Sequence, residues 1–179
     1  MKNIYIGIDP GKQGFISIIK DEEFIFFEMP YEKVDGKKVF CERCLKPLVE
    51  DLVNICKGYE VKVAIEQVTG RGGWSATNNF NFGYTAGLQK MMMIMLDADI
   101  LMVRPQKWQS VMRQGYKDIK KSSSTGKTQV RDPKAVAELI VQTEWPDVDF
   151  RKSTRARKND DNKIDAFLIA QYLKRQNGK

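Results

Sequence analysis

Acidic residues stand at the ends of apolar segments in three separate parts of the chain. Asp9 ends a segment of alternating isoleucines, and Glu66 ends a later run rich in β-branched residues. Asp161 and Asp165 are four residues apart in the last apolar stretch, which puts both on one helix face. An aspartate in a buried strand is costly unless it is paired or bound to a metal. These four carboxylates are therefore candidate metal ligands.

The chemistry that such a set would support is metal-dependent hydrolysis. Mg²⁺ takes oxygen ligands and keeps several waters, and we expect Mg²⁺ here with Mn²⁺ as a substitute. Two such ions can activate a water, hold a scissile phosphate and stabilise the departing 3′ oxygen. The chain has no histidine, so serine and cysteine nucleophiles lack their usual base. No nucleotide cofactor is expected.

Each of these residues also has a purely structural interpretation. Asp9 precedes a Pro-Gly pair and could be an ordinary turn residue, and Glu66 could simply meet solvent at a strand end. Acids at 160, 161 and 165 could favour a helix N-terminus through its dipole. Their joint occurrence, two strand-end acids followed by a helical pair, favours the metal site over these separate explanations.

Hydrophobic periodicity predicts the elements that must position these acids. Strands are expected at residues 3–9, 15–19, 23–28, 61–68 and 100–103. Helices are expected at about 40–57, 75–97, 105–112, 133–144 and 161–174. Loops or linkers are expected at 31–38, 69–74, 113–131 and 146–160. This order predicts an α/β fold in which helices flank a mixed five-stranded sheet, in one domain spanning 1–179.

Composition and charge limit the class of protein. The 179 residues are 42% hydrophobic with a net charge of +7, which fits a folded domain with a polyanionic partner. The sequence shows no cleavable signal and no apolar run long enough for a bilayer, so we expect a cytoplasmic protein without a membrane. Disulfides are not expected in that compartment. We interpret Cys41 and Cys44 as a chance pair near a helix start, with structural zinc as the alternative.

Three motifs resemble the RuvC family of Holliday junction resolvases, and its phage-type members in particular. They are IGIDPG with Gly14 following, AIEQV, and D-x-x-x-D-A-F-L-I-A, and they span residues 6 to 170. The resemblance implies an RNase H-like fold, a homodimer, Mg²⁺ or Mn²⁺, and symmetric nicking of four-way DNA junctions in recombination and repair. It also implies the activity of a crossover junction endodeoxyribonuclease.

Carried over by motif, Asp9, Glu66 and Asp165 match three of the four catalytic carboxylates of this family. The fourth position departs from the cellular enzyme, because the residue three before Asp165 is Asn162. Other branches of the family place the acid four before, which is Asp161 here. We take Asp161 as the fourth ligand, with Asp160 as the fallback.

Basic residues cluster in two segments that flank the acidic elements, 113–131 and 151–158. Lysine and arginine contact phosphates and give sequence-independent, salt-sensitive affinity. A solvated flexible surface is the alternative. We predict DNA contacts by Lys117, Lys120, Lys121, Lys127, Arg155, Arg157 and Lys158.

Three further residues are assigned to the junction by their place after the strands. Arg71 and Trp74 follow Glu66 in a glycine-rich loop, and Trp74 could stack on an unpaired base or pack against the next helix. Lys107 stands where the family often carries a basic residue and is assigned to the scissile phosphate, while Trp108 is interpreted as core. The helix at 75–97 is either core or the dimer helix, and a two-fold dimer suits two symmetric cuts.

Three other functions share some of these features. Another RNase H-like nuclease, acting on flaps, single strands or RNA hybrids, would use the same carboxylates. An ATP-binding protein of the actin and sugar kinase type also begins with an Asp-x-Gly turn, but needs a second phosphate loop and about twice this length. The neutral Asn162 keeps a catalytically inactive binder of branched DNA as the third alternative.

Overall fold

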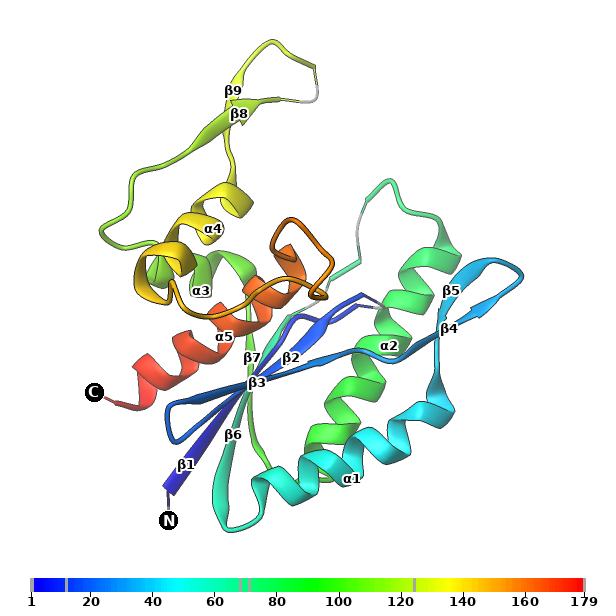
Figure 1. Ribbon diagram of the computed structural model, residues 1–179. Helices are drawn as coiled ribbons and strands as arrows, with labels where there is room; N and C mark the ends of the chain where they lie inside the picture. Colours follow the sequence, from blue (N-terminus) through cyan, green and yellow to red (C-terminus); the bar gives the residue numbers. More distant parts are fainter. Residues whose placement is uncertain (1, 12, 68, 71, 124, 179) are drawn as a thin grey trace.

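A mixed five-stranded sheet forms the centre of the computed structural model, which describes residues 2–11, 13–67, 69–70, 72–123 and 125–178 (Figure 1). The strand order is β3-β2-β1-β6-β7, with β1, β2 and β3 antiparallel and β1, β6 and β7 parallel. The strands are β1 (Lys2–Ile8), β2 (Phe15–Lys20), β3 (Glu23–Glu28), β6 (Tyr59–Glu66) and β7 (Asp99–Val103). The predicted α/β class and the five-stranded sheet are confirmed.

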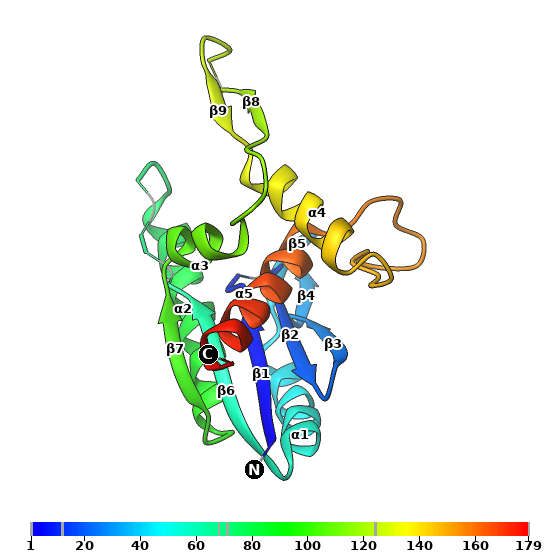
Figure 2. The same ribbon diagram turned by 90° about the vertical axis from the view of Figure 1, so that its left-hand side faces the viewer.

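Helices cover both faces of this sheet. One face carries α1 and α2, and the other carries α3, α4 and α5 (Figures 1 and 2). Their bounds are α1 (Leu45–Cys56), α2 (Ala76–Ile94), α3 (Pro105–Met112), α4 (Pro133–Glu144) and α5 (Asp161–Asn177). A short 3-10 helix, η1 (Glu42–Cys44), precedes α1. None of the helices in the described ranges is long and apolar enough to cross a membrane.

The two faces of the sheet hold two separate apolar clusters. Ile4, Ile6 and Ile8 alternate along β1 and pack, fully buried, with residues of α1 and α2. On the other face, Phe167 of α5 packs edge-on against the rings of Phe24, Trp145 and Phe150, with centroids 4.9 to 5.1 Å apart. Helix α5 is therefore anchored against the sheet along its buried side.

Two segments that were predicted as loops contain β-hairpins. Residues 31–38 belong to a hairpin of β4 (Tyr31–Val34) and β5 (Lys37–Phe40). Its turn is Asp35-Gly36, where both residues have positive φ (49° and 74°), as a two-residue hairpin turn requires. Segment 113–131 contains β8 (Lys120–Ser122) and β9 (Gln129–Arg131). Polar composition concealed both hairpins, because their strands bury little apolar surface.

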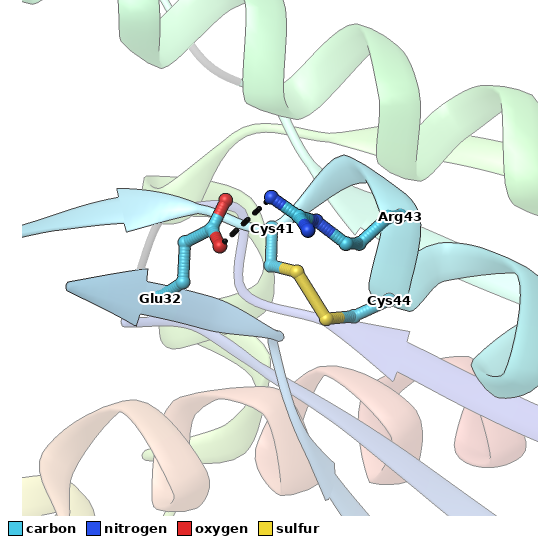
Figure 3. Close-up of a disulfide and its surroundings, with 4 residues drawn as sticks. All are labelled: Glu32, Cys41, Arg43 and Cys44. Atoms are coloured by element: carbon cyan, nitrogen blue, oxygen red, sulfur yellow. Dashed lines mark ion pairs between the residues drawn. A yellow bond between two sulfur atoms is a disulfide. The ribbon is translucent and has the colours of Figure 1, made fainter. Parts of the chain in front are cut away.

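The expectation that the chain has no disulfide is wrong for one pair of cysteines. Cys41 and Cys44 are bonded, with their Cα atoms 5.4 Å apart (Figure 3). The reason is local, since η1 turns the chain and the Cys44 amide donates to the Cys41 carbonyl at 3.2 Å. That separation lies within bridging range. The pair therefore has no free thiolate for the zinc alternative, and burial raises the pKa of the Cys56 thiol to about 11.

Candidate active site

The strand-end acids meet at one edge of the sheet because of the register between β1 and β6. These strands are parallel and Ile8 pairs with Ile65. Asp9 follows Ile8 and Glu66 follows Ile65, so the two acids lie at the ends of neighbouring strands. Adjacent strands lie about 4.8 Å apart. The carboxyl ends of parallel strands are a usual place for functional side chains in α/β folds.

Gly7 brings α5 onto the same edge. A Cβ added at Gly7 would lie 2.2 Å from the carbonyl oxygen of Ala166 and 2.3 Å from the amide nitrogen of Ala170. The backbone of α5 therefore rests directly on β1, and only glycine leaves room for it. Asp165, one residue before Ala166, is placed beside Asp9 by this contact.

A tight turn after β1 fixes the backbone of Asp9. A Cβ at Gly14 would lie only 2.0 Å from the Asp9 carbonyl oxygen, so the chain folds back closely at this point. The amide of Asp9 donates to the Phe15 carbonyl at 3.2 Å, and the amide of Gly14 donates to the Gly11 carbonyl at 3.0 Å. The two glycines of the DPG-x-x-G segment thus allow the tight turn that positions Asp9.

Burial and neighbouring acids raise the pKa values of Asp9 and Asp165. Burial raises the pKa of Asp9 well above its usual value, and the charges of Asp165, Glu66 and Asp160 raise it further. Burial, followed by the charge of Glu66, raises the pKa of Asp165 to about 7. Removal from water and mutual repulsion both disfavour the ionised carboxylates. In the described part of the chain, no three acidic or cysteine side chains are close enough to hold an ion as they stand.

Lys134 is a member of this site that the sequence did not suggest. Its Nζ lies 2.5 Å from Oδ2 of Asp161, and this hydrogen bond raises the pKa of the lysine. Its charge also lowers the pKa values of Asp9 and Asp165, against the larger effect of burial. Helix α4 supplies it two residues after the N-cap Asp132. A single lysine in a chain with 30 Lys and Arg residues carries no distinguishing mark.

The neighbouring acid, Asp160, has a structural task. It is the N-cap of α5, and its Oδ1 accepts hydrogen bonds from the amides of Asn162 at 2.9 Å and Lys163 at 3.2 Å. Capping satisfies helix amides that would otherwise lack a partner. Asp161, in the first turn, instead has its carboxylate directed to Lys134.

Trp108 was interpreted as core, and its 1% exposure confirms that interpretation. The sequence did not reveal its hydrogen bond, in which Nε1 donates to Oε2 of Glu66 at 2.8 Å. A buried indole that bonds to a carboxylate fixes the orientation of that carboxylate, as outer-shell partners of metal ligands do.

We predict that Trp108→Phe lowers activity and divalent-cation affinity by about 10- to 100-fold, because Glu66 loses its positioning donor. The ring volume is largely kept, so the variant should stay folded. Calorimetric titration with Mn²⁺ and a nicking assay would measure both effects. Trp145→Phe, which alters a partly buried indole that packs edge-on against Phe167, is the matched control. Equal effects of the two variants would assign Trp108 a packing role alone.

The lysines and arginines predicted to contact DNA, as far as the structure describes them, lie in three regions. Lys107 is exposed in the first turn of α3, directly before Trp108. Lys117, Lys120, Lys121 and Lys127 are exposed in the segment that holds β8 and β9. Arg155, Arg157 and Lys158 are exposed in the segment before α5. Arg157 and Lys158 share a pocket of about 480 Å³ with Lys134 and Asp161, so the third region adjoins the acids.

The loop after β6 contributes one described aromatic residue. Trp74 is 41% exposed, and its ring meets Phe82 of α2 edge-on with centroids 5.7 Å apart. The packing predicted as one alternative is therefore present, and part of the ring remains accessible. Trp74 and Phe82 line a pocket of about 710 Å³ that reaches Gly11, in the turn after Asp9. Arg71, which was assigned to the junction, lies outside the described residues.

The chain matches no known protein-family profile, and no curated protein matches its sequence. Among solved structures, it is similar to the Thermus thermophilus RuvC structure, with a TM-score of 0.52 and 15% identity over 97% of this chain and 96% of that chain. It is also similar to T. thermophilus RuvC in complex with Holliday junction substrate, with a TM-score of 0.51, 10% identity and the same coverage. At such identities the likeness shows the fold alone. The chain has the RNase H-like fold of RuvC, a mixed five-stranded sheet flanked by helices.

Proposed function

We propose that this protein is a metal-dependent endonuclease that resolves four-way DNA junctions by paired, symmetric nicks. The observation that carries the proposal is the meeting of Asp9, Glu66 and Asp165 at one sheet edge, where burial and neighbouring acids raise the pKa values of Asp9 and Asp165. The fold supports the substrate class, since a RuvC of this fold was captured with a Holliday junction substrate. The net charge of +7 suits a polyanionic substrate.

The donor chemistry of this edge fits Mg²⁺ or Mn²⁺. Asp9, Glu66, Asp161 and Asp165 offer only oxygen, which these hard ions prefer. Repulsion among the carboxylates is a cost that a divalent cation would remove, since it favours the ionised form of every ligand. When bound, two such ions would supply an activated water and stabilise the departing oxygen. Asp161 is the better fourth ligand because Asp160 is engaged as the N-cap of α5.

The protein's own residues would orient the site and admit the phosphate. Trp108 donates a hydrogen bond to Oε2 of Glu66 and so would orient this carboxylate as a ligand. Lys134 keeps a positive charge beside Asp161, and this charge would attract a backbone phosphate to the acids. Arg157 and Lys158, in the adjoining pocket, would hold the strand beyond the cleaved bond. Lys107 would approach the phosphate from α3.

An apolar stripe on α2 supports a homodimer. Phe80, Met91 and Met95 are 69%, 54% and 63% exposed, and Tyr84 stacks on Phe80 with centroids 6.1 Å apart. Phe80, Tyr84, Met91 and the C-cap residue Met95 are separated by four, seven and four positions, which places them on one face of the helix. Exposed apolar surface of this kind marks interaction sites. A second copy related by a two-fold axis would give two identical sites for two cuts.

The test compares a synthetic four-way junction with linear duplex of the same arm sequence, with Mg²⁺, Mn²⁺ or EDTA. We expect divalent-dependent nicks at symmetric positions on opposing strands of the junction, and at least tenfold slower cutting of the duplex. Flap, single-stranded and RNA hybrid substrates complete the panel. Equal cutting of junction and duplex would contradict the junction assignment. Tight junction binding without nicking under any ion would favour a catalytically inactive binder.

A further inference from the structure

The β8–β9 hairpin projects from the body of the protein, and burial of apolar surface in its strands does not explain why it forms. It extends away from α4 in both views (Figures 1 and 2). All six residues of its two strands are exposed, Val130 included at 40%. A two-stranded hairpin alone is at best marginally stable in water. A hairpin of this kind is therefore suited to binding a partner that covers it.

Two ion pairs link the base of this hairpin to the aspartates that flank it, Asp118 and Asp132. The guanidinium of Arg131 lies 2.7 Å from Asp118, and the ammonium of Lys121 lies 3.1 Å from Asp132. Asp132 is also the N-cap of α4, and its side chain accepts a hydrogen bond from the amide of Ala135. The same first turn carries Lys134, which reaches Asp161. The hairpin is thus tied to the helix that enters the candidate active site.

Two lysines remain available for a ligand. Within the described ranges, neither Lys120 nor Lys127 has a carboxylate at ion-pair distance, in contrast to Lys121 and Arg131. Lys120 lies directly opposite Arg131 in the strand register, so both project from one face of the ribbon. Ser122 and Gln129 form the next pair on that face. Lys127 follows Gly126 at the turn.

The chemistry of the hairpin selects a phosphate backbone as its partner. Residues 120–131 contain lysine, arginine, serine, threonine and glutamine, but no acid and no aromatic residue. Lysines, hydroxyls and amides are the groups that contact phosphates and sugars. Without an aromatic ring the hairpin cannot stack on unpaired bases, which single-strand binding uses. A two-stranded β-ribbon is also a shape that a duplex groove accommodates.

We infer that the β8–β9 hairpin grips a duplex arm of the substrate, with Lys120 and Lys127 as the phosphate contacts and Lys121 and Arg131 as braces. This inference rests on the proposed function for its choice of DNA. From residue 119 to the turn, the hairpin reaches roughly 20 Å at about 3.3 Å per residue. That length corresponds to about six base pairs at 3.4 Å each. The contact would contribute affinity along the arm and leave the chemical step unchanged.

The experiment measures binding of the full chain to a four-way junction, a 20-base-pair duplex and single-stranded dT20, across a salt series with Ca²⁺ or EDTA. The Lys120→Gln/Lys127→Gln variant should lower the slope of log affinity against log salt by about 1.8, at about 0.9 per phosphate contact. The fall in duplex affinity between about 50 and 200 mM salt would then shrink about tenfold. Binding to dT20 should change less than twofold.

A matched control removes two exposed lysines from α1 and its C-cap, Lys46→Gln/Lys57→Gln, and should leave every slope unchanged. An unchanged duplex slope in the hairpin variant would overturn the inference, as would an equal loss on dT20. Thermal melting of each variant separates lost contacts from lost folding. If the wild type nicks nothing but the duplex slope still falls by this amount, the hairpin inference stands and the proposed catalysis fails.

Discussion

Asp9→Asn is expected to abolish metal-dependent nicking, with a rate loss of about 1000-fold or more. A carboxylate that holds a divalent ion contributes several kcal/mol of transition-state stabilisation, and each 1.36 kcal/mol is tenfold in rate. The same change should raise the melting temperature of the metal-free protein at neutral pH, because burial and neighbouring acids disfavour the charge on Asp9. Loss of activity with gain of stability is the signature of a functional acid.

The stability gained by replacing a buried carboxylate depends on pH, in the direction that the pKa shifts determine. A carboxyl group whose pKa is raised by folding weakens the folded state above its ordinary pKa of about 3.9. For Asp165, whose folded pKa is about 7, the weakening grows from about pH 4 and is complete above pH 7. Asp165→Asn should therefore stabilise the metal-free protein at pH 8 and have little effect at pH 4. Melting curves at both values measure this.

The control for Asp9→Asn is Asp51→Asn, an exposed aspartate on α1 at a distance in sequence from every candidate ligand. It should change neither rate nor melting temperature. Junction affinity measured in EDTA should survive in the Asp9 variant, since binding depends on the basic segments. Residual nicking above a tenth of the wild-type rate would remove Asp9 from the proposed metal site.

Gly7→Ala is expected to cost about 3 kcal/mol of unfolding free energy, at the upper end of the usual range for overpacking a core. The new Cβ would lie 2.2 Å from the Ala166 carbonyl oxygen and 2.3 Å from the Ala170 amide. Both are backbone atoms, so no side chain can move aside and α5 must shift away from β1. Because α5 carries Asp161 and Asp165, activity should fall even in molecules that remain folded.

Urea unfolding followed by circular dichroism gives the stability difference. Gly83→Ala on α2 is the matched substitution, since its new Cβ has no atom within 4 Å among the described residues. Alanine there should be neutral or stabilise the helix by about 0.5–1 kcal/mol. Equal stability of the two variants would mean that α5 does not rest on β1 as the structure has it.

The positions of the strand-end acids could be predicted because they follow from local patterns. Alternating isoleucines define β1, and a β-branched run defines β6, so the acids that end them fall at one sheet edge once the strands are parallel. The pairing of Glu66 with Trp108 and of Asp161 with Lys134 could not be predicted. Each joins elements far apart in sequence through a residue type that is common in any chain.

The two hairpins and the disulfide could not be predicted from the hydrophobic pattern of the sequence. The turn at Asp35-Gly36 is a recognisable hairpin dipeptide, but polar flanking residues led to the prediction of a loop. In β8 and β9 every residue is exposed, so no alternation of burial exists to be read. The prediction that Cys41 and Cys44 form no disulfide came from the expected compartment. The 3-10 turn between them instead sets the separation of their Cα atoms, which allows the bond.

The most direct measurement of the central claim is anomalous diffraction from crystals grown with Mn²⁺. We predict one or two peaks between Asp9, Glu66, Asp161 and Asp165, with carboxylate oxygens at about 2.0–2.6 Å from the ions. Lys134 should have turned from Asp161 to solvent or to a phosphate. The account would be contradicted if manganese bound only elsewhere in the protein. It would also be contradicted if, at saturating Mn²⁺, no ion were bound between these four carboxylates and they remained apart.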